Sequence, residues 1–157
     1  MNRPTSRREF LRAAGGAAAG VGLWSVVAVE PARATPAAMR EAIRTVVGSA
    51  RINTGRVRLE MPPLSENGNA VPLAVSVESP MTATDHVRAI YVFTEKNPQP
   101  DVASFHLGPR AGHARVATRI RLADTQTVVA ISELSDGSFW SGSADVVVTL
   151  AACLEDA

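Results

Sequence analysis

The chain has 157 residues, with 16 Lys and Arg, 15 Asp and Glu and a formal net charge of +1. Five of these basic residues and two of the acidic ones lie in residues 1–34, so the remainder carries a net charge of −2. That balance excludes the basic surface on which nucleic-acid binding depends. Residues 35–157 are enough for one domain with a single core, and their lone cysteine excludes an internal disulfide.

Residues 1–34 have the pattern of an export signal. Arg7 and Arg8 precede a run of small and apolar residues from 13 to 29. Such an arginine pair is typical of twin-arginine signals, and Ala32-Arg33-Ala34 fits the small-x-small pattern of a signal-peptidase site. We expect cleavage after residue 34 and a periplasmic protein. We expect no stable membrane anchor, because the apolar run is shorter and weaker than the roughly 20 strongly apolar residues of a bilayer span.

Residues 35–50 are predicted to contain a short helix. Thr35 suits the N-cap position, Pro36 the first helical position and Gly48 the stop. One face of this helix is apolar, with Met39, Ile43, Val46 and Val47 at helical spacing. An apolar stripe of this kind packs either on its own domain or on a partner.

Residues 51–150 consist of short alternating runs divided by turn signals, which is typical of antiparallel strands. Asp136-Gly137, between two such runs, predicts a hairpin. Strands are predicted at 57–61, 73–79, 87–94, 102–107, 114–122, 126–133 and 137–150. About seven strands without a long helix between them favour an all-β, immunoglobulin-like sandwich. A small barrel is the alternative.

Few residues suggest catalysis or metal binding. The three histidines, His86, His106 and His113, do not have the spacing of a metal cluster. A Gly-x-Ser-x-Gly nucleophile motif is also missing from the sequence. We therefore predict no metal and no cofactor, and a hydrolase or metalloenzyme is the least supported class.

Cys153 is the most informative single residue. It follows the last predicted strand within a tail of residues 151–157. Chain ends fray unless other contacts hold them, so we expect an accessible thiol. The alternative is an inert cysteine buried under the sandwich.

Several motifs, in order and at close to the expected spacing, give the chain a resemblance to a known family. They are Ser65-Glu66-Asn67-Gly68 with Val71-Pro72, Glu95 to Pro100, Val102 to Phe105 with Leu107-Gly108, Thr118 to Leu122, Thr125 to Ala130 and Val146 to Leu150. Together with the twin-arginine signal, these motifs resemble SoxY, the sulfur-carrying subunit of the periplasmic thiosulfate-oxidising system.

The resemblance implies an immunoglobulin-like sandwich that forms a heterodimer with SoxZ, a small β protein without an export signal of its own. It also implies that Cys153 is the covalent attachment point for sulfur. In the family, a haem enzyme conjugates thiosulfate to the thiol, a hydrolase releases sulfate and a dehydrogenase oxidises the remaining sulfur. The carrier itself is not an enzyme.

The tail departs from the family pattern, which ends in Gly-Gly-Cys-Gly-Gly. Here Ala151 and Ala152 precede the cysteine, and Leu154, Glu155 and Asp156 follow it. Alanine narrows the backbone freedom that glycine provides, and leucine widens the tail. The negative charges disfavour a thiolate and repel thiosulfate. A second interpretation is therefore a SoxY-like heterodimer scaffold that does not load sulfur.

Overall fold

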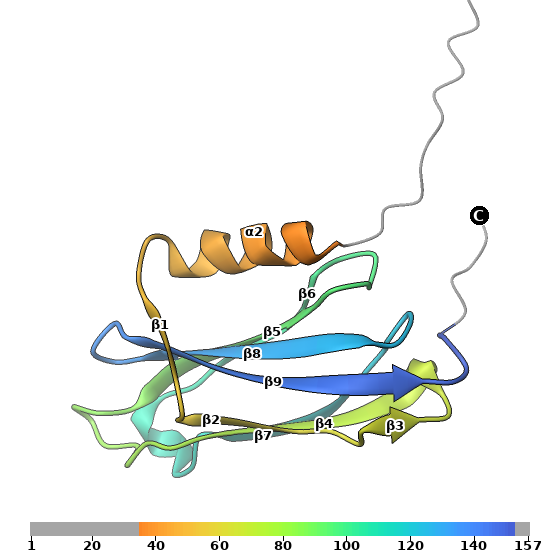
Figure 1. Ribbon diagram of the computed structural model, residues 1–157. Coiled ribbons are helices and arrows are strands. Elements are labelled where there is room, and N and C mark those ends of the chain that lie inside the picture. The colour runs from red at the N-terminus through yellow and green to blue at the C-terminus, as the bar shows by residue number, and fades with distance from the viewer. Residues whose placement is uncertain (1–34, 153–157) are drawn as a thin grey trace, which may run out of the picture. The chain divides into compact units, whose positions relative to one another are not determined.

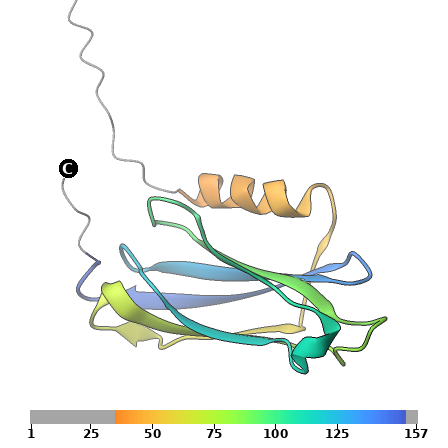
Figure 2. The same ribbon diagram turned by 180° about the vertical axis from the view of Figure 1, so that it is seen from behind.

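The computed structural model describes residues 35–152, which form three layers. Helix α2 (Pro36–Val47) covers one face of a large sheet, and a small sheet packs on the opposite face (Figure 1). The view from behind shows the same order of layers (Figure 2). The predicted signal, with Arg7 and Arg8, lies outside the described residues. Within them no helix is long and apolar enough to cross a membrane.

The two sheets together contain nine strands. The large sheet has the order β1 (Ile52–Thr54), β9 (Phe139–Val148), β8 (Gln126–Leu134), β5 (Val87–Thr94) and β6 (Asp101–His106), and β3 (Leu64–Ser65) also pairs with β9. The small sheet has the order β2 (Val57–Glu60), β4 (Val71–Val77) and β7 (Arg115–Ile120). Two short 3-10 helices, Gly68–Ala70 and Pro109–Ala111, lie in the connections.

The fold is the predicted sandwich rather than a barrel. All seven predicted strands are present, and their observed ends differ from the predicted ends by no more than two residues. All seven pair with a neighbour in antiparallel fashion. β1 and β3 were not predicted, and both pair with β9 in parallel. Between them the chain passes through β2 in the other sheet, so residues 52–65 connect the two sheets along one edge.

Alternation along the strands places the core between the sheets. In β4, Val71 and Val75 are fully buried, whereas Pro72 is exposed on the opposite face. Facing them from the large sheet are Ile90, Val92, Val128 and Val146, each at most 1% exposed. The buried apolar area of this core supplies most of the stability of the fold.

Helix α2 forms as the sequence predicts, and its stripe packs on its own domain. The Thr35 side chain accepts a hydrogen bond from the Ala38 amide at 3.1 Å, and Gly48 ends the helix with a positive φ of 64°. A second apolar cluster joins the helix to the outer face of the large sheet through Met39, Val47, Phe93, Ile131 and Phe139. Ile43 and Val46 of the stripe are half-buried and pack against this cluster, so the stripe is engaged by the chain's own sheet.

Candidate functional site at the C-terminal end of the sandwich

The structure describes two of the predicted tail residues, Ala151 and Ala152. Cys153 and the three flanking positions after it, Leu154, Glu155 and Asp156, lie outside the described residues. The candidate site is therefore the framework that immediately precedes the cysteine in the chain.

Strand β9 approaches this framework along β3. The Val147 amide donates to the Pro63 carbonyl at 2.9 Å, and the Thr149 amide donates to the Ser65 carbonyl at 3.1 Å. On the other side, the Val148 amide donates to the Thr125 hydroxyl at 2.9 Å. The last strand is thus held from both sides up to its final residues.

Three backbone hydrogen bonds then join three distant segments. The Gly68 amide donates to the Leu150 carbonyl at 2.9 Å, and the Leu122 amide donates to the Gly68 carbonyl at 2.8 Å. The Ala152 amide donates to the Leu122 carbonyl at 3.2 Å, and Ala152 is only 7% exposed. We call Gly68, Leu122, Leu150 and Ala152 the clasp. It fixes the chain to the sandwich up to the residue before Cys153.

Only glycine fits at position 68. A Cβ atom there would overlap the Leu122 carbonyl oxygen and would lie 2.7 Å from the Ala152 nitrogen. Both neighbours are backbone atoms that take part in the clasp, so neither can move without breaking a hydrogen bond. The glycine of the Ser65-Glu66-Asn67-Gly68 motif therefore permits a close approach of three backbones.

The Asn97 side chain stabilises the part of the clasp around Leu122. Its Nδ2 donates to the Arg121 carbonyl at 2.8 Å, and its Oδ1 accepts from the Ala123 amide at 3.0 Å. These two groups belong to the peptide units on either side of Leu122. The Leu122–Ala123 peptide unit thus donates to Asn97 at one end and accepts from Ala152 at the other. Hydrogen bonds linked in this way through one peptide group polarise each other.

Gln126 in turn fixes the Asn97 side chain. Its Nε2 donates to Asn97 Oδ1 at 2.9 Å, and its Oε1 accepts from the Lys96 amide at 2.8 Å. Asn97 and Gln126 are 7% and 4% exposed. A buried amide pair with its hydrogen bonds made gives the loop at Leu122 one defined conformation.

The surface beside the clasp carries cationic side chains. Arg119 and Arg121 line an open hollow together with Asn97 and Asp101, so the ionisable side chains of this hollow carry a net charge of +1. Lys96 nearby is 3.1 Å from the Asp124 carboxylate. Exposed guanidinium groups attract anions, although salt screens the attraction beyond about 8 to 10 Å.

The other groups capable of chemistry are dispersed. His86 Nδ1 is 3.1 Å from the Thr82 carbonyl, and the His106 ring lies edge-on to Tyr91 at 6.3 Å. Burial, together with the nearby Glu133 carboxylate, raises the pKa of Tyr91 above its ordinary value. Among residues 35–152, no group of three His, Cys, Asp or Glu side chains could hold a metal ion.

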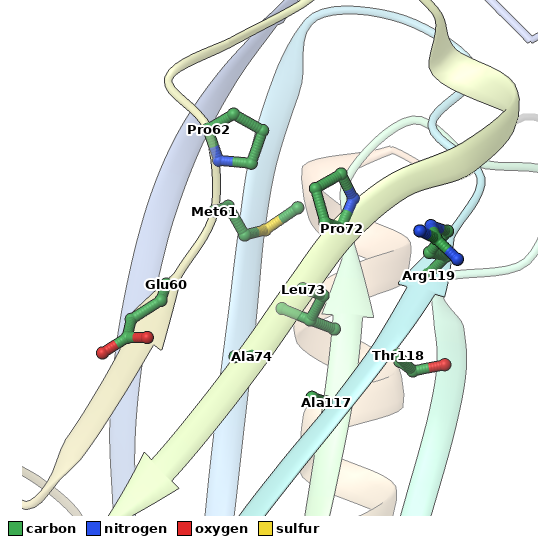
Figure 3. Close-up of a pocket in the computed structure, with 9 residues that line it drawn as sticks. All are labelled: Glu60, Met61, Pro62, Pro72, Leu73, Ala74, Ala117, Thr118 and Arg119. Atoms are coloured by element: carbon green, nitrogen blue, oxygen red, sulfur yellow. The ribbon is translucent and has the colours of Figure 1, made fainter.

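A second open hollow lies on the outer face of the small sheet (Figure 3). Pro72 and Ala74 of β4 lie between Glu60 of β2 and Arg119 of β7 (Figure 3). Glu60 is engaged with Arg115 at 3.5 Å. This face holds small side chains and one ion-pair cluster, and it offers no convergent set of reactive groups.

Sequence reasoning missed the clasp. It singled out the segments around Gly68, Asn97 and Gln126 as family motifs without assigning roles to them. The signal in those segments was the turn chemistry of Asn67-Gly68 and Asn97-Pro98, which predicts loops but not their convergence. The clasp bonds join backbone groups, which leave no side-chain pattern in a sequence.

The fold and the site define the class of the protein. It is an immunoglobulin-like β-sandwich whose C-terminal strand is fastened to the body up to the residue before a cysteine. The model of the family "Sulfur oxidation protein SoxY" matches residues 43–153, and its last matched residue is Cys153. The chain belongs to the SoxY family.

Solved structures agree with this assignment. The sulfur carrier protein SoxY from Chlorobium limicola f thiosulfatophilum is 30% identical, with a TM-score of 0.61, and the match covers 73% of this chain and 98% of that one. A superoxide reductase from Ignicoccus hospitalis is 19% identical, with a TM-score of 0.54, covering 62% of this chain and 94% of that one. A putative superoxide reductase from Thermotoga maritima is 23% identical, with a TM-score of 0.53, covering 62% and 93%. The two reductases share the fold alone. No curated protein matches the chain.

Proposed function

We propose that the protein is a periplasmic sulfur carrier of a thiosulfate-oxidising system, with sulfur intermediates held covalently on Cys153. The observation that carries this proposal is the family match, which runs through the sandwich and ends on that cysteine. The Chlorobium relative is itself a sulfur carrier protein. In this role the chain is the substrate of partner enzymes and needs no cofactor of its own.

The loading chemistry needs only the thiol and an external oxidant. A bond between the Cys153 sulfur and the outer sulfur of thiosulfate forms with loss of the thiol proton and two electrons. A haem partner enzyme would accept those electrons. Arg119 and Arg121, near the clasp, outweigh Asp101 in the same hollow, and the remaining positive charge favours the approach of an anion to this end of the sandwich.

The proposed partner is a SoxZ-like β protein, exported together with this chain by the twin-arginine route. The helix stripe is occupied by the chain's own sheet, which leaves the sheet edges as docking candidates. Strands β6 and β7 are each at the edge of their sheet. Asp101 of β6 and Arg119 of β7 line one hollow, so the two edges are neighbours. Unpaired edges of this kind favour pairing with a partner strand.

Intact mass spectrometry tests the carrier function. The purified protein is incubated with thiosulfate and the oxidising partner enzyme, alongside a Cys153→Ser variant and a sample without the enzyme. A mass increase is expected only in the wild type with enzyme present. Equal masses for wild type and variant would overturn the carrier function.

The second candidate is a scaffold subunit that forms the heterodimer but carries no sulfur. The sequence after the cysteine, Leu154-Glu155-Asp156-Ala157, favours this candidate because it is bulkier and more acidic than the family's glycines. A scaffold would retain its partner through purification and would show a slow thiol reaction that the oxidising enzyme does not accelerate.

A further inference from the structure

We infer that Gly68 and Asn97 are positioning residues for the Cys153 thiol. In this inference, which rests on the proposed function, the clasp fixes the backbone up to Ala152 and so limits where the next residue, Cys153, can lie. Neither residue would touch the sulfur. Each acts through Leu122, whose carbonyl accepts the last hydrogen bond before the cysteine.

Only one peptide bond separates the last anchored residue from the cysteine. Ala152 is buried and donates to Leu122, and Cys153 is the next residue. One trans peptide, about 3.8 Å between Cα atoms, separates the anchored residue from the thiol-bearing one. If the clasp opens at Ala152 and Leu150, the first held group is the Thr149 amide on β3. The nearest held residue would then be four positions before Cys153 instead of one.

The side chain that supports the Leu122 loop is a buried polar one, Asn97. Asn97 is buried and both ends of its amide are used, one on the Arg121 carbonyl and one on the Ala123 amide. An apolar residue would fill the same space in an ordinary core. An amide at this position holds the two peptide groups that flank Leu122, and so fixes the direction of the Leu122 carbonyl toward Ala152.

Three motifs from separate parts of the chain meet at the Leu122 loop. Gly68 comes from the connection before β4, Asn97 from the connection after β5 and Gln126 from the start of β8. These segments lie far apart in the chain, and the Ala152 amide is where their hydrogen-bond chains end. The network thus extends past the end of β9 and holds the residue directly before the cysteine.

Three glycine variants separate positioning from general stability. Gly68→Ala would place a Cβ against the Leu122 carbonyl oxygen and the Ala152 nitrogen. Gly142→Ala is the strained control, because its Cβ would lie 2.5 Å from the Val57 carbonyl oxygen, away from the clasp. Gly108→Ala is the neutral control, since nothing lies within 4 Å of its Cβ.

Asn97→Asp tests the same inference without adding an atom. The carboxylate can still accept from the Ala123 amide, but it cannot donate to the Arg121 carbonyl and would repel it. This variant removes one specific support of the Leu122 loop and leaves the glycine turn untouched.

The experiment combines amide hydrogen exchange with alkylation of Cys153 in the full-length protein. In Gly68→Ala and Asn97→Asp, the hydrogen bond from the Ala152 amide to the Leu122 carbonyl is expected to be lost. The Ala152 amide should therefore exchange at least about fivefold faster, relative to the Val92 amide. The ratio of alkylation rates for a bulky maleimide and for iodoacetamide should also rise. Neither quantity should rise in Gly108→Ala or Gly142→Ala.

The inference is overturned if Ala152 exchanges no faster relative to Val92 in the two clasp variants, or if their alkylation ratio equals that of Gly142→Ala. Neither readout needs a sulfur substrate. Failure of the wild type to load thiosulfate, with these readouts as expected, would overturn the proposed function alone. Loading of the wild type with unchanged readouts in the variants would overturn the positioning role alone.

Discussion

Single polar and glycine residues decide how the last part of the chain is held. Asn97 and Gly68 have no reactive group, yet the hydrogen bonds of the Leu122 loop depend on both. Leaving a buried hydrogen-bonding group without a partner costs about 1 to 3 kcal/mol. Substitutions at these two positions should therefore weaken the hydrogen bond between the Ala152 amide and the Leu122 carbonyl.

The acidic residues after the cysteine give a prediction at the scale of the residue. Neutralising both with Glu155→Gln and Asp156→Asn removes charges that disfavour the thiolate. The iodoacetamide reaction of Cys153 near neutral pH should become about twofold faster at low salt, and the gain should shrink at high salt. Glu78→Gln, at the far end of β4 from the clasp, is the control for loss of one negative charge away from the cysteine. An equal rate at low salt would show that the tail charges do not act on the sulfur.

Asp136, in the β8–β9 hairpin, gives a pH prediction. Hydrogen bonds from the Ser138 hydroxyl and amide lower the pKa of Asp136 below its ordinary value of 3.8. Because the folded-state pKa is depressed, its stabilisation is present above about pH 4 and is lost as the pH falls through the folded pKa. The effect is below about 1 kcal/mol, since the side chain is exposed.

The measurement is the melting temperature of wild type and Asp136→Asn across the acidic range. The wild type should melt at the higher temperature near neutral pH, and the difference should disappear at the acid end. A difference that is constant with pH would rule out the carboxylate as its source.

At the scale of the element, helix α2 closes one face of the large sheet. Met39 and Val47 are buried against Phe93 and Ile131, while Arg40 points to solvent. Truncating a buried methionine removes apolar contact area and leaves a cavity. The helix is therefore part of the folded domain rather than a free docking segment.

A urea titration measures the contribution of this helix. Met39→Ala should lower the free energy of unfolding by about 2 kcal/mol, the lower end for such truncations, because the site lies near the surface and can relax. Arg40→Ala, its exposed neighbour, should change it by less than about 0.5 kcal/mol. If both variants unfold at the wild-type urea concentration, the helix does not stabilise the sandwich.

Elements with a local pattern could be predicted from the sequence, and those formed by distant pairing could not. Alternation revealed seven strands, and the capping residues Thr35 and Gly48 revealed the helix. β1 and β3 are three and two residues long and exist because they pair with β9, far along the chain. A segment that short shows no alternation.

The candidate site could likewise be predicted only in part. The position of Cys153 after the final strand was evident from the sequence, because that strand has a strong pattern and the chain holds one cysteine. The clasp was not, since its bonds connect residues 68, 122 and 152 through backbone groups. Family resemblance marked the right segments without saying that they meet.

At the scale of the whole molecule, the sheets, the helix and the clasp together hold the chain in a defined structure up to the residue before Cys153. Helix α2 covers the outer face of the large sheet (Figure 1). The two sheets bury the core between them, and the hydrogen bonds of β3 and the clasp hold the chain up to Ala152. In the proposed function, this order means that partner enzymes would meet a fixed framework next to the cysteine. The chain's membership of the SoxY family fits this use.

The most direct test of sulfur carriage is the mass of the intact protein after enzymatic loading. Wild type and Cys153→Ser are incubated with thiosulfate and the oxidising partner enzyme, and each sample is measured before and after a thiol reductant. We predict an adduct on the wild type alone, removed by the reductant because it is joined through a sulfur–sulfur bond. An adduct on both proteins, or on neither, would contradict sulfur carriage by Cys153.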